Sequence, residues 1–496
     1  MKKILYITMT AAMLASCDGY LKEDSGDLLI PTKVEEYASV LYGEGYPNHL
    51  TDDVEWMQLL SDDAEVSRQA HKPSQNSKGD DDVFLSSGKG AFTWAQDIEY
   101  YINSYAKAYQ DAYSNINACN IVLENWQTME GKQEERNLIA AQAYGLRAYA
   151  YFCLVNWYGE PYREETAKED LGVVIRLNSR VVRDYPERNT VAEVYDQINH
   201  DLDSALILFD ESPKVTNPYI FSKRAACLLK SRVALFQGQW EKVVEYATPL
   251  SENNYSLCTI STMSNTQLSH DVDYHFIAAD SPETIWMFGG RPATTGYNSY
   301  MYNCMYIDGA VFAVSQTRSD DLYNSYSDGD NRIYAFFAQD GDNCHRNIYY
   351  KYWSWNDYSQ AFRTPEALLN MAEAKAQLGE LQEALDLVNQ LRKNRIRRSR
   401  FSEFTTDKYG TQEEVLKVVR AERRRELCFE ETHRWWDLRR QGCPQLKHVF
   451  YSSASAAPET YILEENDRNY TLELPKSELR YNTNIKPIDR RVIKPE

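Results

Sequence analysis

The fold class of this chain follows from SKRAACLLKSRVALFQGQWEKVVEYA, residues 222–247. An Ala- and Leu-rich helical pattern leads into a short turn that contains Gly238, and a second helical pattern continues through Val243 and Ala247. Small side chains allow two helices to pack closely, and glycine readily adopts the backbone conformation of a tight turn. The stretch therefore predicts two helices that fold back on each other.

The same pattern returns in TPEALLNMAEAKAQLGELQEALDLVNQLR, residues 364–392, with Gly379 in the turn. Both stretches resemble the tetratricopeptide helix-turn-helix, although the two copies are not contiguous along the chain. We expect about four such pairs, embedded in a larger domain rather than forming a free solenoid.

Helical patterns also occupy residues 95–160 and 191–209. The first ends at Gly159, a typical helix breaker. The second is preceded by Thr190, and Glu193 follows three positions later, which is the signature of a capping box. These segments together predict a mostly α-helical protein.

Residues 251–360 lack helical periodicity and are rich in Asn, Asp, Ser, Thr, Gly and Tyr. A long segment without regular pattern is usually functional or disordered, and its many aromatic residues argue against disorder. We expect it to hold the ligand. The predicted organisation is a signal peptide (1–16), an N-terminal segment with loops (17–94), a helical scaffold (95–250), an aromatic-rich insert (251–360), C-terminal helix pairs (361–445) and an irregular C-terminal segment (446–496).

The N-terminus has the pattern of an export signal. Lys2 and Lys3 precede an apolar run that is much shorter than the roughly 20 residues a membrane-spanning helix needs. The run ends in Leu-Ala-Ser-Cys17, which resembles the lipobox of bacterial lipoproteins. The resemblance implies cleavage before Cys17 and lipidation of that residue; the alternative is an ordinary cleaved signal. We expect no other stretch to be apolar enough to cross a membrane.

Composition excludes several classes of function. The chain has 496 residues and a net charge of −19, which argues against nucleic acid as a partner, because phosphates require a basic surface. The nine cysteines show no metal-binding spacing; several lie on apolar helical faces and are expected to be buried, and the spacing specifies no disulfide. The sequence contains no zinc-protease, serine-hydrolase, P-loop or dinucleotide-binding motif. We therefore expect no metal, no cofactor and no catalytic site.

Aromatic residues are the candidates for ligand binding. The chain has 37 Tyr, 16 Phe and 10 Trp, and the aromatics of the insert lie among Asn and Asp. Sugars present apolar faces ringed by hydroxyl groups, so their sites combine aromatic platforms with polar side chains. The alternative is that many of these aromatics pack the insert onto the helices. The candidates are Trp353, Trp355, Tyr297, Tyr300, Tyr302, Tyr306 and Asn298, with Trp94 as a weaker one.

Two groups of acidic residues have competing interpretations. Glu422, Glu426 and Glu430 recur at helical spacing, and paired carboxylates can hydrolyse glycosides. Arginines interleave with them, so we expect a structural ion network instead. The second group has oxygen ligands of the kind that calcium prefers but lacks the EF-hand pattern, so we expect solvated turns; it comprises Asp328, Asp330, Asp340, Asp342 and Asn343.

Several segments in series carry a family resemblance. They are the lipobox with CDGYLKEDSGDLLIPT, QAYGLRAYAYFCLVNWYGEPY (142–162), RNTVAEVYDQINHDLDSAL (188–206), SKRAACLLKSRVALFQGQW (222–240), SPETIW (281–286), DGDNR (328–332), the helix pair at 364–392, VVRAERRRELCFEETHRWWDLRRQG (418–442) and LPKSELRYNTNI (474–485). In this order they resemble the SusD/RagB family of outer-membrane nutrient-binding lipoproteins. One departure is the ending, KPIDRRVIKPE, where the family often has an Asn-Pro-Gly-Tyr-like tail.

The resemblance implies a SusD-like α-helical fold with four tetratricopeptide-like pairs. It implies docking on a SusC-like TonB-dependent transporter, which the lipoprotein covers as a lid at the outer membrane. It also implies capture of glycan (oligosaccharide) without catalysis, which is the function we expect. The alternative is a peptide-binding homologue of the same architecture, and a glycoside hydrolase is a third hypothesis.

Overall fold

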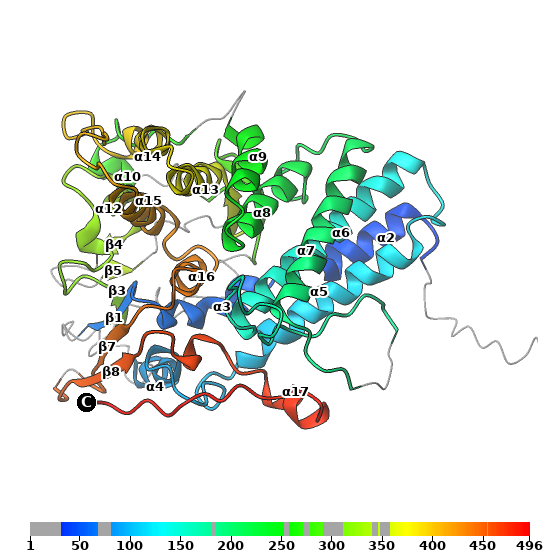
Figure 1. The fold of residues 1–496 in the computed structure, drawn as a ribbon, viewed down its shortest axis with the longest axis horizontal. Helices are drawn as coiled ribbons and strands as arrows, with labels where there is room; N and C mark the ends of the chain where they lie inside the picture. The colour runs from blue at the N-terminus through cyan, green and yellow to red at the C-terminus, as the bar shows by residue number, and fades with distance from the viewer. Residues whose placement is uncertain are drawn as a thin grey trace, which may run out of the picture.

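The computed structural model describes residues 31–67, 81–180, 185–251, 257–270, 277–290, 311–339, 346–347, 358–453 and 455–496. Helices dominate these residues, and the labelled strands gather at one side of the molecule, at the left of Figure 1. One large cluster of buried apolar side chains connects helices and strands. The mostly helical fold that the sequence predicts is confirmed.

The helical scaffold is centred on one apolar helix. Its members are α5 (Tyr105–Asn125), α6 (Gln133–Tyr158), α7 (Val191–Asp210), α8 (Lys223–Phe236) and α9 (Trp240–Ser251). α6 packs against both α5 and α7, and almost every residue from Ile139 to Tyr158 is buried.

The length and composition of α6 would suit a membrane span, and it is the only such helix within the described ranges. This corrects the expectation that no stretch beyond the N-terminal signal is apolar enough. However, 89% of its most apolar window is buried inside the protein, so its apolar residues serve the core.

The two helix pairs expected from sequence are present. The second consists of α13 (Thr364–Gln377) and α14 (Leu381–Arg395). Gly238 and Gly379 occupy the turns with φ of +67° and +82°, a conformation that favours glycine. α13 also packs against α9, so the two pairs are neighbours in space although they are far apart in the sequence.

The N-cap of α7 is also as expected. The Glu193 amide donates to Thr190 Oγ1 at 3.2 Å, and the Thr190 amide donates to Glu193 Oε2 at 2.8 Å. This reciprocal capping box satisfies two amides that the first turn of a helix leaves without partners.

The segments expected to be irregular contain short elements. The N-terminal ones are α2 (Val34–Val40), the π-helical turn η1 (Leu41–Gly45), α3 (Leu50–Val54), the 3₁₀ turn η2 (Glu55–Leu60), β1 (Ala64–Ser67) and α4 (Asp81–Phe92). The insert contains α10 (Asn265–His270), β2 (Thr284–Phe288), β3 (Val311–Val314), η4 (Tyr323–Ser325), α12 (Arg332–Phe336), β4 (Ala338–Gln339) and β5 (Arg346–Asn347), and β6 (Gln360–Arg363) closes it. Most are too short to show a helical or strand period in the sequence.

The C-terminal part is more regular than the sequence indicates. Its elements are α15 (Gln412–Leu427), α16 (His433–Arg440), β7 (Leu446–Phe450), β8 (Glu459–Leu463), the 3₁₀ turn η6 (Arg468–Tyr470) and α17 (Lys476–Tyr481). β7 and β8 form an antiparallel hairpin, and the last residues, after α17, run back along the lower edge of the molecule to the C-terminus (Figure 1). This hairpin corrects the expectation of an irregular segment at 446–496.

Candidate functional site

A cluster of buried charges lies where α15 meets β6 and α14. Glu426 of α15 is fully buried and contacts three guanidinium groups. Its carboxylate lies 2.9 Å from Arg395 Nη2, 3.2 Å from Arg363 Nη1 and 3.1 Å from Arg332 Nη1. Such charges are stable inside a protein only when they are paired in this way.

The electrostatics of this cluster argue against acid catalysis. Burial alone would raise the pKa of Glu422, but Arg332 and Arg425 outweigh it and lower that pKa to about 2. Arg395 and Arg363 likewise outweigh burial and hold the pKa of Glu426 well below its usual range. A general acid must keep its proton near neutral pH. The predicted ion network is therefore confirmed, and Glu422 and Glu426 are not suited to act as the general acid of glycoside hydrolysis.

Sequence reasoning identified Glu422, Glu426 and Glu430 but not their distant partners, and it wrongly placed Glu430 on the same helix, because α15 ends at Leu427. Arg363 also contacts Glu283 at 2.8 Å and Glu430 at 2.5 Å. A second buried group joins Arg232 of α8 to Glu366 at 2.6 Å and to Glu431 at 2.8 Å. These partners come from distant segments, so no local spacing pattern could identify them. The network ties α8, β6, α13 and α15 together.

The acidic turn at 328–332 differs in part from expectation. Asp328 is exposed and pairs with Arg400 at 3.2 Å, as a solvated turn would. Asp330 instead is buried and binds Arg332 at 2.7 Å, which makes it part of the ion network. This is a correction for Asp330. Asp340, Asp342 and Asn343 lie outside the described residues.

Trp94 belongs to the core. It is fully buried, and its indole nitrogen donates to the Leu60 carbonyl at 2.9 Å. Its ring stacks on His448 with 4.2 Å between ring centroids. These contacts leave no indole surface for a ligand, so the expectation that Trp94 binds ligand is corrected.

The other aromatic candidates and the lipidation site lie outside the described residues; they are Tyr297, Asn298, Tyr300, Tyr302, Tyr306, Trp353, Trp355 and Cys17. Two segments, 291–310 and 348–357, contain the aromatic candidates of the insert. The described residues that flank these segments come together at two places. At the first point, the Ser359 amide donates to the Gly290 carbonyl at 2.9 Å, beside the antiparallel pair of β2 and β6.

The second point joins β1, β3 and β5. Val311, the first described residue after 291–310, pairs with Ser67 in the antiparallel ladder of β1 and β3. β3 also packs against β5, which ends at Asn347, directly before 348–357. The described residues that flank the two segments therefore come together at two places on the folded body.

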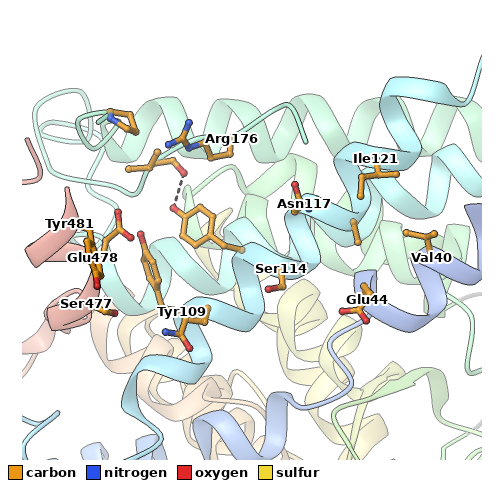
Figure 2. Close-up of a pocket in the computed structure, with 15 residues that line it drawn as sticks. Val40, Glu44, Tyr109, Ser114, Asn117, Ile121, Arg176, Ser477, Glu478 and Tyr481 are labelled. Carbon is orange, nitrogen blue, oxygen red and sulfur yellow. Dashed lines mark hydrogen bonds between the residues drawn. The ribbon is translucent and has the colours of Figure 1, made fainter. Parts of the chain in front are cut away.

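A separate hollow lies on the outer face of α5 and has a volume of about 770 Å³. We call it the α5 groove. α17 forms one end of it, and η1 with the end of α2 forms the other, as Figure 2 shows. Gln110, Ser114 and Asn117 of α5 line it, and the chain around Arg176 and Pro186 forms a side wall. Sequence reasoning missed this groove, because α17 and α5 are separated by most of the chain.

Known families match this chain over most of its length. A family model described as "Starch-binding associating with outer membrane" matches residues 42–235. The model of the SusD family matches residues 261–494, so the two follow each other along the chain. The chain belongs to the SusD/RagB family.

Curated SusD-like relatives span most of this chain. "SusD-like protein P2" of Formosa agariphila is 24% identical over 419 residues, covering 76% of this chain and 78% of the relative. "SusD-like protein P38" of the same organism is 26% identical over 353 residues, covering 60% of this chain and 65% of that protein.

Solved structures share the fold of this SusD/RagB protein. A SusD-like carbohydrate binding protein from Bacteroides vulgatus has a TM-score of 0.68 at 20% identity, covering 91% of this chain and 97% of that structure. A SusD superfamily protein from Bacteroides thetaiotaomicron has a TM-score of 0.67 at 19% identity, covering 92% and 100%. At such identities the likeness establishes the fold, and the ligand is a separate question.

Proposed function

We propose that this SusD/RagB protein is a lipid-anchored glycan-binding protein of the outer membrane. It captures oligosaccharide at the cell surface and delivers it to a SusC-like TonB-dependent transporter. Family membership supports the carbohydrate ligand and the outer-membrane location, since one matching family model is described as starch-binding and associated with the outer membrane. The lipobox-like sequence before Cys17 supports the anchor.

The proposed ligand site is supported by one observation: the described residues that flank the two aromatic-bearing segments lie close together. The described residues that flank 291–310 and 348–357 meet at the Gly290–Ser359 contact and at the β1–β3–β5 region. We propose that Trp353, Trp355 and the tyrosines at 297, 300, 302 and 306 contribute to one sugar-binding surface, with Asn298 at its edge.

The helical half suits the role of a scaffold. We infer that about four helix pairs of the tetratricopeptide type form it, supported by the packed neighbours α5–α6, α8–α9 and α13–α14. A transporter would dock on this half, and the insert at 251–360 would hold the ligand. Stacked helix pairs provide a broad, rigid surface for a protein partner.

The carbohydrate ligand can be tested against the peptide alternative. Trp353→Ala and Trp355→Ala should each weaken glycan binding about tenfold, because base stacking on an aromatic platform, the nearest measured case, contributes about 1–3 kcal/mol and sugars should fall at the low end. Isothermal titration with a panel of oligosaccharides measures this. Trp240→Ala, at a half-buried tryptophan of α9, is the control and should leave affinity unchanged. Binding of a peptide pool in place of all glycans would favour the alternative, and oligosaccharide cleavage would favour the hydrolase.

Partnership with a transporter needs its own experiment. The protein should co-purify with a large outer-membrane barrel when membranes are solubilised in mild detergent. Isolation as a free monomer from cells growing on the inducing nutrient would contradict this part of the proposal.

A further inference from the structure

The floor of the α5 groove follows the helix and combines exposed polar side chains with apolar ones. Gln110, Ser114 and Asn117 are exposed, line the groove and recur at a spacing of four and three residues, which places them on one face of α5. From Tyr109 to Ile121, both of which line the groove, the helix rises about 18 Å. The groove is therefore long enough to hold an extended oligomeric ligand of several monomer units.

The side wall of the groove is fixed by hydrogen bonds from α5. Tyr113 Oη donates to the Val174 carbonyl at 2.7 Å, a bond drawn dashed in Figure 2. Asn120 Nδ2 donates to the Arg176 carbonyl at 3.1 Å. Each bond joins a helix side chain to the backbone of the wall. The wall is thus held in place before any ligand arrives.

The end wall formed by α17 is fixed in the same manner. Asn482 Nδ2 donates to the Pro186 carbonyl at 2.9 Å, and Asn484 Nδ2 donates to the Tyr185 carbonyl at 2.6 Å. The Lys476 amide at the start of α17 donates to Glu99 Oε2 at 2.8 Å. A preformed site does not have to spend binding energy on ordering its walls.

One end of the groove presents an exposed aromatic ring. Tyr481 of α17, which lines the groove, is 73% exposed. Tyrosine offers an apolar face and a polar hydroxyl group, so this ring can contact a ligand in the groove.

The chemistry of the groove favours a neutral, hydroxyl-rich ligand. Amide and hydroxyl groups line part of its floor, and the exposed ring of Tyr481 stands at one end, which is a combination that a sugar chain needs. Its charged lining residues, Glu44, Glu478 and Arg176, are of both signs, so it does not select strongly for an ion. Its volume lies within the usual range of about 300–1,000 Å³ for ligand sites.

We propose that the α5 groove is a second oligosaccharide-binding site, separate from the aromatic segments of the insert. The inference rests on the proposed function, because it assigns the same class of ligand. It predicts that the protein holds a glycan chain at two places, one on the helical scaffold and one on the insert. Two linked contacts with one ligand raise the overall affinity without requiring either to be strong.

The experiment compares four variants with the wild-type protein; the fourth combines the groove and insert substitutions described below. The groove variant combines Tyr481→Ala with Asn117→Ala, both at exposed positions, so its melting temperature should be unchanged. The insert variant combines Trp353→Ala with Trp355→Ala. Tyr100→Ala is the matched control, since Tyr100 is 77% exposed and does not line the groove. The probes are a panel of neutral oligosaccharides and, separately, a peptide pool, both measured by isothermal titration.

We expect the groove variant to bind the longer oligosaccharides about tenfold more weakly than Tyr100→Ala does. The insert variant should keep residual glycan binding, and adding the groove substitutions should remove it. Hydrogen exchange of residues 476–486 should slow when oligosaccharide is bound.

Three outcomes would overturn the inference. If the groove variant binds every oligosaccharide as tightly as the control, while the insert variant does not, the second site is wrong and the proposed function stands. If the wild-type protein binds no oligosaccharide, the proposed function itself fails. If the groove substitutions weaken binding of peptides only, the groove is a peptide site.

Discussion

Replacing Arg363 with methionine tests the buried ion network most directly. Arg363 is fully buried and forms ion pairs with three carboxylates, those of Glu283, Glu426 and Glu430, at 2.8, 3.2 and 2.5 Å. Removing one partner of a buried ion pair typically costs about 3–5 kcal/mol, because a charge is left uncompensated. Since one guanidinium here compensates three carboxylates, we expect a loss near the upper end, about 5 kcal/mol at neutral pH.

The size of this loss should depend on pH. In Arg363→Met the carboxylates left behind should have raised pKa values, so the folded variant should bind protons more readily than the wild-type protein does. The destabilisation should therefore shrink as the pH falls from 7 towards 5. Urea denaturation at both pH values measures it through the shift of the midpoint at constant slope.

Arg468→Met is the control for this experiment. Arg468 pairs with Asp489 at 3.5 Å, and the two side chains are 66% and 89% exposed. Because water screens such a pair, its loss should change the free energy of unfolding by about 0–1 kcal/mol. The reasoning is refuted if Arg363→Met costs no more than this control, or if its cost is the same at pH 5 and pH 7.

Other predictions follow from single positions. Burial lowers the pKa of His448 from 6.5 to about 4, so the protein should lose stability as the pH falls from about 6.5 to about 4; His448→Phe should flatten this part of a melting-temperature profile, and an unchanged slope would contradict it. Gly145→Ala should cost about 1–3 kcal/mol in urea denaturation, because the new Cβ would lie 2.2 Å from Phe221 Cε1, whereas a neutral effect would show that the ring moves freely. Gly379→Ala, where a Cβ meets no atom within 4 Å, should still cost about 1–2 kcal/mol through its φ of +82°. Cys17→Ser should release the protein from the outer membrane in fractionated cells, and equal retention would argue against the lipid anchor.

Local sequence patterns predict the helical part of the fold. The capping box at Thr190 and Glu193, and the turn glycines Gly238 and Gly379, depend on residues only a few positions apart, so the sequence displays them directly. The free cysteines of the described helices and loops are buried as small apolar groups, also as expected from their positions; they are Cys119, Cys153, Cys227, Cys258, Cys428 and Cys443.

Predictions from the sequence are wrong where an element is short, or where tertiary packing buries a residue that lies near polar residues in the sequence. The hairpin of β7 and β8 was missed because strands of this length hardly differ from loops in composition. Trp94 stands near a polar loop in the sequence, yet its ring is buried against His448, which is hundreds of residues away along the chain. Sequence proximity to polar residues does not reveal which side chains the fold covers.

The sequence reveals the helix pairs, the net negative charge and the arginines interleaved with the acids of the charged helix, since periodicity, capping and net charge are properties of neighbouring residues or of composition. Tertiary structure alone decided which distant charges meet and where surfaces are hollow. Arg232 contacts Glu431 only in the folded chain. Likewise, α17 forms one end of the α5 groove only after the chain has folded. The physical reason is that pairing of buried charges and the shape of a groove depend on contacts between segments far apart in sequence, which no local pattern encodes.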